Sequence, residues 1–304
     1  MHDIIIIGGG PAGMTAALYA LRNGKSALVL EKGGFGGQIV YSPRVENFPG
    51  SLSMSGNEFA DRMLEQILAQ GAELEVETVT EIKEEGDLKR VLTESGVSFL
   101  CKAVIISTGV KHRMLGLEGE NELVGNGISF CAVCDGEYYR GQTVAVAGGG
   151  NSALQEATLL ADVCKEVIMV QDLDCFTGEE MLTKALLAKP NVRALTGTAI
   201  EGIKTEAGAL VGLNLRKKAT NESAFLPCDG LFVAIGLIPE NKMFSKLVPL
   251  DCAGYIDSGE NCLTGRPGFF VAGDCRAKEI RQLTTAAADG AVAALAACKY
   301  IDMN

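Results

Sequence analysis

Two closely spaced cysteines are the residues of this chain best suited to chemistry. Cys131 and Cys134 are separated by two residues and followed directly by Asp135. This spacing permits a reversible disulfide, and a helix starting here would stabilise one thiolate through backbone N–H groups and the helix dipole. A zinc site would need further ligands, and neither histidine is close in sequence. The pair therefore predicts redox chemistry and no metal, with two buried structural cysteines as the alternative.

The N-terminal residues predict a βαβ unit with a glycine-rich first turn. A β-branched run at 3–7 precedes Gly8, Gly10 and Gly13, a helix-like stretch follows over 14–22, and a second apolar strand ends at Glu31. In a dinucleotide fingerprint these glycines allow the tight turn, the close approach of a pyrophosphate and close helix–strand packing, in that order. The pyrophosphate then lies at the positive helix end, and Glu31 can accept hydrogen bonds from ribose hydroxyls.

The same pattern occurs a second time. A strand over 143–147 leads into Gly148, Gly150 and Ala153, followed by a helix over about 152–161 and a strand over 166–170. A further strand ends in Gly-Asp at 273–274, and an Ala-rich helix over about 282–300 follows it. Two dinucleotide-type folds predict two bound dinucleotides, or one together with a relic of the other.

Together these features closely resemble the low-molecular-weight thioredoxin reductase family over essentially the whole chain. The resemblance implies an α/β fold with two Rossmann-like dinucleotide-binding domains, the second inserted into the first. The expected FAD-binding domain comprises 1–111 and 243–304, and the inserted NAD(P)-type domain, 112–242, carries the cysteine pair. FAD is the implied cofactor, thioredoxin or a thioredoxin-like protein the implied partner, and a homodimer the implied assembly. The matching segments are 8–20, 33–38, 45–50, 106–110, 131–136, 232–236 and 271–294.

The resemblance also implies roles for single residues. Cys134 would face the flavin, Cys131 would attack the partner disulfide, and Asp135 would be the general acid that protonates the leaving thiol. The residues expected around FAD are Gly8, Gly10, Pro11, Ala12, Gly13 and Glu31 at the pyrophosphate and ribose, Gly37, Gln38 and Asn47 near the flavin, Val79 near the adenine, Thr108 and Gly109 over the cofactor, Asp274 at the ribityl chain, and Arg281 and Gln282 at the isoalloxazine or phosphates.

The segment after the second strand of the inserted domain departs from this family. The usual member has His-Arg-Arg there and a further Arg a few residues on, which pair with the 2′-phosphate of NADPH. This chain has Gln171, Asp172 and Leu173, then Thr177, and no Lys or Arg between 171 and 183. A phosphate dianion would meet acidic side chains here, so we expect an electron donor other than NADPH.

Several donors and functions remain open from the sequence. The missing arginines resemble the ferredoxin-dependent flavin thioredoxin reductases, and a ferredoxin at about −400 mV could reduce thioredoxin at about −270 mV with about 6 kcal/mol released. Asp172 could instead bind the 2′-hydroxyl of NADH. We favour ferredoxin over NADH. Two further alternatives are an FAD- and oxygen-dependent oxidase of small dithiols and a flavoprotein redox sensor without turnover.

The amino-acid composition limits the kinds of partner that this chain can bind. The net charge of −11 argues against nucleic acid and anionic membranes. The apolar run at 4–7 is too short for a membrane span or signal peptide, so we expect a cytoplasmic protein. The other cysteines are scattered and are expected to be small buried hydrophobic residues in a reducing compartment. An acidic ferredoxin would need a local basic patch on this acidic chain.

Overall fold

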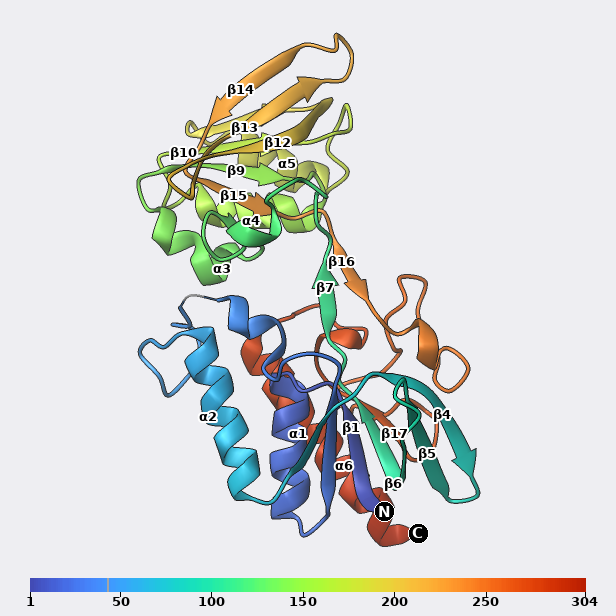
Figure 1. The fold of residues 1–304 in the computed structure, drawn as a ribbon. Helices are drawn as coiled ribbons and strands as arrows, with labels where there is room; N and C mark the ends of the chain where they lie inside the picture. The colour runs from blue at the N-terminus through green and yellow to red at the C-terminus, as the bar shows by residue number, and fades with distance from the viewer. Residues whose placement is uncertain (43) are drawn as a thin grey trace. The chain divides into compact units, whose positions relative to one another are not determined.

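The computed structural model describes residues 1–42 and 44–304, which divide into two compact units (Figure 1). The first unit is Met1–Lys111 with Ile238–Asn304, and the second is His112–Leu237. The chain passes between them through β7 (Val110–His112) and β16 (Leu237–Pro239), which pair with each other. The second boundary lies before the expected position at 242/243 because Asn241 is held in the first unit. Its side-chain amide donates to the carbonyl oxygens of Gly254 and Cys275 at 3.0 and 2.7 Å.

The first unit is built on a mostly parallel sheet with the order β3-β2-β1-β6-β5-β4, and β17 also pairs with β6. The strands β1, β2, β3, β6 and β17 run parallel, whereas β4 and β5 are antiparallel additions. Along β1, Ile4 and Ile6 face one hydrophobic core and Ile5 and Ile7 the other, as expected of a parallel sheet covered on both faces. The strands are β1 (His2–Ile7), β2 (Ala27–Glu31), β3 (Glu73–Val76), β4 (Val79–Glu85), β5 (Leu88–Thr93), β6 (Ser98–Ile106) and β17 (Phe269–Val271).

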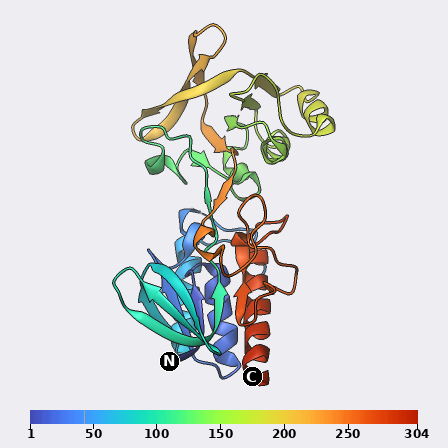
Figure 2. The ribbon, with the colours of Figure 1, turned by 90° about the vertical axis from the view of Figure 1, so that its right-hand side faces the viewer.

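Helices α1 (Pro11–Arg22) and α6 (Leu283–Met303) run side by side in this unit, as Figures 1 and 2 show. Gly290 makes the close approach possible, because a Cβ there would lie 2.2 Å from the carbonyl oxygen of Ala12. Ser55 caps α2 (Gly56–Ala69) by accepting from the N–H of Glu58 at 3.1 Å. The 3-10 helices of this unit are η1 (Gly37–Tyr41), η4 (Lys242–Phe244) and η5 (Gly273–Cys275).

The second unit contains a parallel sheet of order β11-β10-β9-β15-β8 and a separate antiparallel sheet of order β12-β13-β14. Both units thus have a strand–glycine turn–helix–strand unit in a parallel sheet, which confirms the predicted α/β fold. In the part of the chain that the structure describes, no helix is both long and apolar enough to cross a membrane. The elements are β8 (Ile128–Ser129), β9 (Thr143–Ala147), β10 (Glu166–Val170), β11 (Val192–Leu195), β12 (Thr198–Glu206), β13 (Ala209–Lys217), β14 (Ser223–Pro227), β15 (Gly230–Val233), η2 (Asn121–Leu123), α3 (Ala132–Asp135), η3 (Gly136–Tyr139), α4 (Asn151–Leu160) and α5 (Glu180–Leu187).

His112 makes the second unit sensitive to acid. Its ring stacks on Phe130 with centroids 4.3 Å apart, and burial lowers the pKa of His112 from 6.5 to about 4. Between these values the unfolded chain binds a proton that the folded chain does not, so stability is lost as pH falls through this window. We expect a loss of about 2 kcal/mol between pH 7 and pH 5 from this group. Urea unfolding at the two pH values should therefore show a smaller pH effect in His112→Gln than in the wild type.

The control for this measurement is His2→Gln, which removes the other histidine of the sequence. His2 lies in the first unit, where its ring nitrogen is 3.6 Å from Glu73. The control variant should keep the full loss at pH 5. An unchanged pH response in His112→Gln would show that the buried ring does not cause the acid sensitivity.

Candidate redox and cofactor site

The cysteine pair lies at the start of a short helix. Cys131 is the N-cap of α3 and is disulfide-bonded to Cys134. The backbone N–H of Cys134 donates to the Cys131 Sγ at 3.2 Å, and the N–H of Cys131 donates to the Ser129 Oγ at 3.1 Å. Of the two sulfurs, Cys131 thus receives a hydrogen bond that would stabilise its thiolate once the disulfide is reduced.

Asp135 ends α3 and is half-buried. Burial raises the pKa of its carboxyl, and the hydroxyl of Ser129, which donates to Oδ2 at 2.6 Å, opposes this only in part. The other oxygen, Oδ1, is buried and has no hydrogen-bond partner among the described residues. A carboxyl whose pKa is raised is better suited to act as a general acid than an ordinary aspartate. The sequence did not reveal Ser129 as the residue that holds both Asp135 and the Cys131 backbone.

The first glycine turn has two glycines, Gly8 and Gly13, that the fold requires and one, Gly10, that leaves room for a ligand. Gly8 has φ +111°, and a Cβ there would lie 2.3 Å from the Ser107 carbonyl oxygen. A Cβ on Gly13 would lie 1.9 Å from the Gly8 carbonyl oxygen. By contrast, the atom nearest to a Cβ on Gly10 is the Cα of Gly37, 3.8 Å away. The space in front of Gly10 is therefore open to a pyrophosphate.

Replacing Gly13 by alanine should weaken this turn without touching the cysteine pair. The added methyl would overlap the Gly8 carbonyl, so we expect a loss of about 1–3 kcal/mol in unfolding free energy and weaker retention of FAD through gel filtration. The control is Gly259→Ala, in a loop where a Cβ meets nothing closer than 3.7 Å. Full stability and full flavin content in Gly13→Ala would contradict the geometry of the turn.

Glu31 is the last residue of β2, and its carboxylate holds the first glycine turn through hydrogen bonds. Its Oε2 accepts from the N–H of Gly9 at 2.7 Å, and its Oε1 accepts from the N–H of Gly33 at 3.0 Å. A carboxylate has about four acceptor sites, so both oxygens retain capacity for ribose hydroxyls. Pro11 and Ala12 form the first turn of α1 behind it, and Ala12 lies against Gly273.

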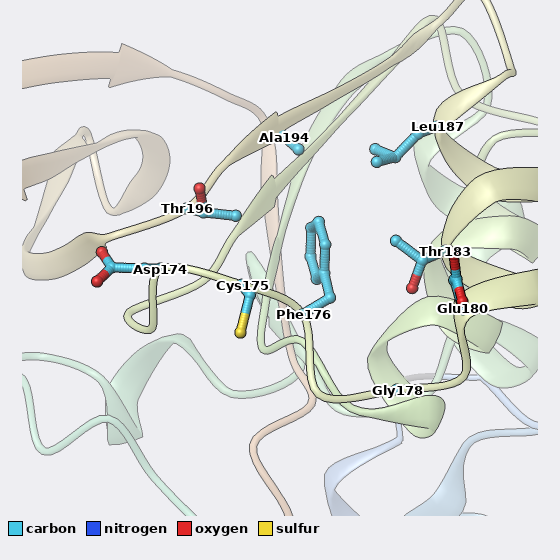
Figure 3. Close-up of a pocket in the computed structure, with 9 residues that line it drawn as sticks. All are labelled: Asp174, Cys175, Phe176, Gly178, Glu180, Thr183, Leu187, Ala194 and Thr196. Atoms are coloured by element: carbon cyan, nitrogen blue, oxygen red, sulfur yellow. The ribbon is translucent and has the colours of Figure 1, made fainter.

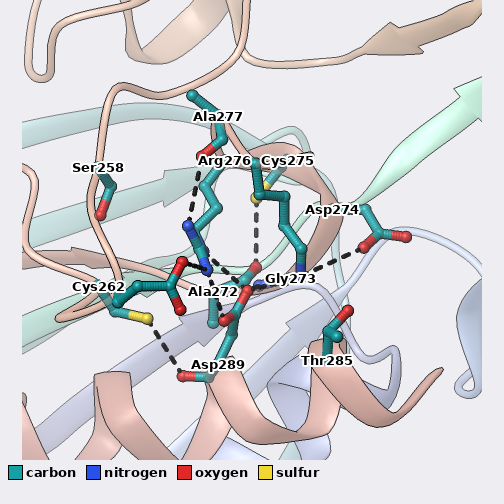
Figure 4. Close-up of polar contacts among 12 residues, drawn as sticks. Ser258, Cys262, Ala272, Gly273, Asp274, Cys275, Arg276, Ala277, Thr285 and Asp289 are labelled. Atoms are coloured by element: carbon teal, nitrogen blue, oxygen red, sulfur yellow. Dashed lines mark hydrogen bonds and ion pairs between the residues drawn. The ribbon is translucent and has the colours of Figure 1, made fainter. Parts of the chain in front are cut away.

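Asp274 lies in η5, within a buried ionic cluster (Figure 4). Its Oδ1 is buried without a hydrogen-bond partner in the described part of the chain, and burial raises the pKa of its carboxyl. Lys278 lies 3.8 Å from this oxygen in an ion pair, but its hydrogen bond and that of Arg276 go to Asp289 of α6, at 2.9 and 2.8 Å. A buried carboxylate oxygen without a hydrogen bond is costly unless a donor satisfies it. A ribityl hydroxyl is such a donor, so the site fits FAD.

The remaining expected FAD residues differ in what their side chains do. Thr108 donates to the Asn241 Oδ1 at 3.2 Å, and Gly109 follows it with φ +66°. Val79 is buried in the core, so only its backbone could contact a ligand. Gln38 and Asn47 are exposed.

Arg281 and Gln282 contact other parts of the protein. The guanidinium of Arg281 lies over the Tyr255 ring, 4.2 Å from its centroid, and its Nε donates to the Asp274 carbonyl at 3.3 Å. The side chain of Gln282 accepts from the N–H of Thr285 and so caps α6. These contacts hold the segment between Asp274 and α6 in place. From the sequence, Arg281 and Gln282 were expected only to bind FAD, and this structural role was not predicted.

The second glycine turn has the geometry of the first. Gly148 has φ +126°, a Cβ there would lie 2.4 Å from the Ala234 carbonyl oxygen, and the methyl of Ala153 is buried beside it. At the end of β10, Gln171 occupies the position that Glu31 has in the first unit: its side chain covers Gly149, and its Nε2 donates to the Cys175 carbonyl at 3.3 Å. The acceptor carboxylate of the first turn is thus replaced by a buried amide.

The segment after β10 folds back onto this turn. The N–H groups of Thr177 and Gly178 donate to the Gly149 carbonyl at 2.8 and 3.0 Å. Asp172 is exposed and pairs with Lys218 at 3.1 Å, and Leu173 is 48% exposed. Lys218 lies in the connection between β13 and β14. It could therefore not be found as a nearby cation from residues 171–183 alone.

A cavity of about 510 Å³ lies next to the segment (Figure 3). Among the described residues its lining contains two acidic side chains and no basic one, so it does not suit an anion such as a phosphate. Cys175 lines it and is exposed, as is Cys252, whereas the other free cysteines are buried as expected. The prediction of burial was wrong for these two. The lining residues are Asp174, Cys175, Phe176, Gly178, Glu180, Thr183, Leu187, Ala194 and Thr196.

Residues 2–290 match the family model described as pyridine nucleotide-disulphide oxidoreductase, so the chain belongs to this class of enzymes. Within the class, it is 38% identical over 302 residues to the thioredoxin reductase of Listeria monocytogenes, covering 99% of this chain and 94% of that one. It is also 40% identical to the "34.2 kDa protein in rubredoxin operon" of Clostridium pasteurianum, covering 98% and 97%. The crystal structure of thioredoxin reductase from Streptococcus pyogenes superposes with a TM-score of 0.94 at 36% identity, covering 100% and 99%.

The chain therefore belongs to the low-molecular-weight thioredoxin reductase family, whose members are FAD-dependent disulfide oxidoreductases. This confirms the predicted enzyme class and cofactor. These relatives do not support the narrower prediction of a ferredoxin-dependent member. When bound, FAD would supply the electrons for disulfide reduction.

Proposed function

We propose that this chain reduces the disulfide of thioredoxin or a thioredoxin-like protein, and that its electrons come from reduced ferredoxin and not from NADPH. The observation that carries the donor assignment is the chemistry of Gln171, Asp172, Leu173 and Thr177. These residues offer an amide, a carboxylate, an alkyl group and a hydroxyl where a 2′-phosphate needs cations. The resemblance to the family also supports a homodimer, which light scattering on the purified protein would test.

Electrons leave through Cys131 and Cys134. The Cys131 thiolate attacks the partner disulfide and forms a mixed disulfide, and Asp135 protonates the sulfur that departs. Cys134 then attacks the Cys131 sulfur, restores the internal disulfide and releases the reduced partner. The N–H hydrogen bond to the Cys131 Sγ supports this order, because it favours Cys131 as the thiolate.

The charges around the second glycine turn argue against NADPH. Lys218 is near, but the Asp172 carboxylate at 3.1 Å already balances its charge. Thr177 presents a hydroxyl toward Gly150, with its Oγ1 3.8 Å from the position of a Cβ there. The side chain of Gln171 is neutral and 5% exposed. Between residues 171 and 183 a phosphate dianion would find no cation.

Ferredoxin is supported by energetics. Transfer from a ferredoxin at about −400 mV to thioredoxin at about −270 mV releases about 6 kcal/mol for two electrons. An iron–sulfur protein donates electrons without binding at a nucleotide site. Such a donor is therefore compatible with a second glycine turn whose only role is to pack the helix against the strand.

NADH is the second candidate, because the second glycine turn is fully formed. Gly150 leaves open space in front of it, as Gly10 does in the first turn, so a pyrophosphate could approach. Asp172 is exposed at the end of β10 and could bind a 2′-hydroxyl after separating from Lys218. A small-molecule dithiol oxidase ranks below both candidates, because the Cys-Ala-Val-Cys-Asp-Gly motif resembles that of the reductases more closely.

An anaerobic mixing experiment with the purified holoenzyme separates these donors. NADPH, NADH or reduced ferredoxin is added in turn, while flavin bleaching and the appearance of thioredoxin thiols are followed. Rapid bleaching with thiol formation from ferredoxin alone supports the proposal, rapid reduction by NADPH overturns it, and rapid turnover with NADH replaces ferredoxin. Oxygen consumption with small dithiols, without thioredoxin reduction by any donor, identifies an oxidase instead.

A further inference from the structure

Asp289 is a buried carboxylate of α6 that accepts hydrogen bonds from three residues of the segment 273–278 (Figure 4). Its Oδ2 accepts from the backbone N–H of Gly273 at 3.1 Å, from the Arg276 Nε at 2.8 Å and from the Lys278 Nζ at 2.9 Å. Its Oδ1 accepts from the Arg276 Nη2 at 2.9 Å. The side chains of Arg276, Lys278 and Asp289 are 3, 5 and 8% exposed. Asp289 thus holds this segment on α6 from within the protein.

The Lys278 ammonium lies between two carboxylates. It donates to Asp289, and its Nζ is 3.8 Å from the Oδ1 of Asp274, the buried oxygen that has no hydrogen bond among the described residues. An ammonium has three donors on a flexible stem. A movement of about 1 Å would therefore bring Lys278 to hydrogen-bonding distance from Asp274. In the structure the hydrogen bond goes to Asp289.

The charge of Asp289 determines which carboxylate Lys278 joins. Two buried cations, Arg276 and Lys278, need anionic partners, because an unpaired buried charge is costly. Arg276 has a second partner at the surface in Glu260, which is 96% exposed and 3.5 Å away. The second partner of Lys278 in the described part of the chain is Asp274. If Asp289 lost its charge, Lys278 would turn to Asp274 and occupy the free oxygen.

We propose that Asp289 is a positioning residue of the FAD site, which holds the Lys278 ammonium away from Asp274 and so keeps the Asp274 Oδ1 free for a hydroxyl of the cofactor. The inference rests on the role expected for Asp274 at the ribityl chain. It does not depend on which donor reduces the flavin or on which protein the enzyme reduces. The hydrogen bond from the Gly273 N–H to Asp289 also fixes the backbone next to Asp274.

Release of FAD from the diluted holoenzyme, followed by the rise in flavin fluorescence, tests the proposal. Asp289→Asn keeps the size of the side chain and removes its charge. FAD should bind this variant about tenfold more weakly than the wild type, because Lys278 then competes for a hydrogen bond of Asp274. Adding Lys278→Met removes the competing ammonium and should restore most of the lost affinity. Glu260→Gln, which removes the exposed partner of Arg276, should bind FAD as the wild type does.

The double variant distinguishes competition from a merely structural role. If Asp289 only stabilises the fold, adding Lys278→Met to Asp289→Asn removes a further contact and leaves the affinity for FAD as weak or weaker, which overturns the proposal. Unchanged affinity in Asp289→Asn also overturns it. Far-UV circular dichroism shows whether each variant folds. If Asp289→Asn does not fold, Lys278→Met alone decides: it should release FAD no faster than the wild type, and faster release overturns the proposal.

Asp274→Ala tests the premise separately. This variant should release FAD faster than the wild type, and adding Asp289→Asn should cause little further loss, because the oxygen for which Lys278 competes is gone. Wild-type retention of FAD in Asp274→Ala would refute the expected role of Asp274 and the inference with it. Faster release from Asp274→Ala together with wild-type retention in Asp289→Asn would refute the inference and leave the role of Asp274 intact.

Discussion

Replacing Cys134 by serine is expected to lower the rate of protein disulfide reduction by at least about 10³-fold, because a serine cannot form the second half of a redox dithiol. Cys131 would still be able to attack the partner disulfide, since its Sγ keeps the N–H hydrogen bond from residue 134. Turnover should therefore stop at a mixed disulfide. The trapped complex would be visible on a non-reducing gel after incubation with oxidised thioredoxin.

The reciprocal variant tests which cysteine attacks. Cys131→Ser should be equally inactive but should trap little partner, because the remaining thiol is not the one held at the helix N-cap. Cys252→Ser changes an exposed free cysteine of the first unit and should keep wild-type turnover. Trapping by Cys131→Ser in place of Cys134→Ser would reverse the assignment, and turnover by both would exclude the pair.

The sequence predicts the backbone framework of this protein well, because strong local signals determine it. Gly13 is required by a contact with the Gly8 carbonyl inside the same motif, whereas the contact that requires Gly8 is with Ser107, which follows β6. The equivalence of Glu31 and Gln171 is likewise predictable, since each follows the second strand of a βαβ unit. The periodicity of apolar residues and the spacing of the glycines are sufficient to predict features of this kind.

The partners of charged side chains could not be predicted, because they come from distant segments. Lys218 meets Asp172 across 46 positions of sequence, through a hairpin whose register depends on the whole unit. Glu156 meets Ala132 across 24 positions, because α4 packs beside α3. One residue did indicate a buried ion pair in the sequence. Asp289 is an acidic residue inside an Ala-rich helix, and in the structure it is buried against Arg276 and Lys278. A buried charge of this kind needs a partner.

These long-range contacts also change how the donor site is understood. From the sequence, Asp172 appeared as a free carboxylate near a dinucleotide turn. In the structure it is half of an ion pair with Lys218, so its own charge is balanced. The obstacle to NADPH is then less the repulsion of this acid than the lack of a cation between residues 171 and 183 to bind the 2′-phosphate.

That distinction predicts that cations can restore the missing function. The combined variant Asp172→Arg, Leu173→Arg and Thr177→Arg should reduce its flavin with NADPH at least about 10²-fold faster than the wild type, since each charge-assisted hydrogen bond to phosphate contributes about 1.5–3 kcal/mol. Anaerobic stopped-flow bleaching of the flavin measures this. The matched control places Gln at the same three positions, which removes the acid and changes the shape without adding charge. If the lack of cations is the obstacle, the Gln variant stays slow and the Arg variant becomes fast. If both remain slow with intact fold and flavin, the second glycine turn does not admit a dinucleotide, which leaves packing as its role and an iron–sulfur donor as the source of electrons.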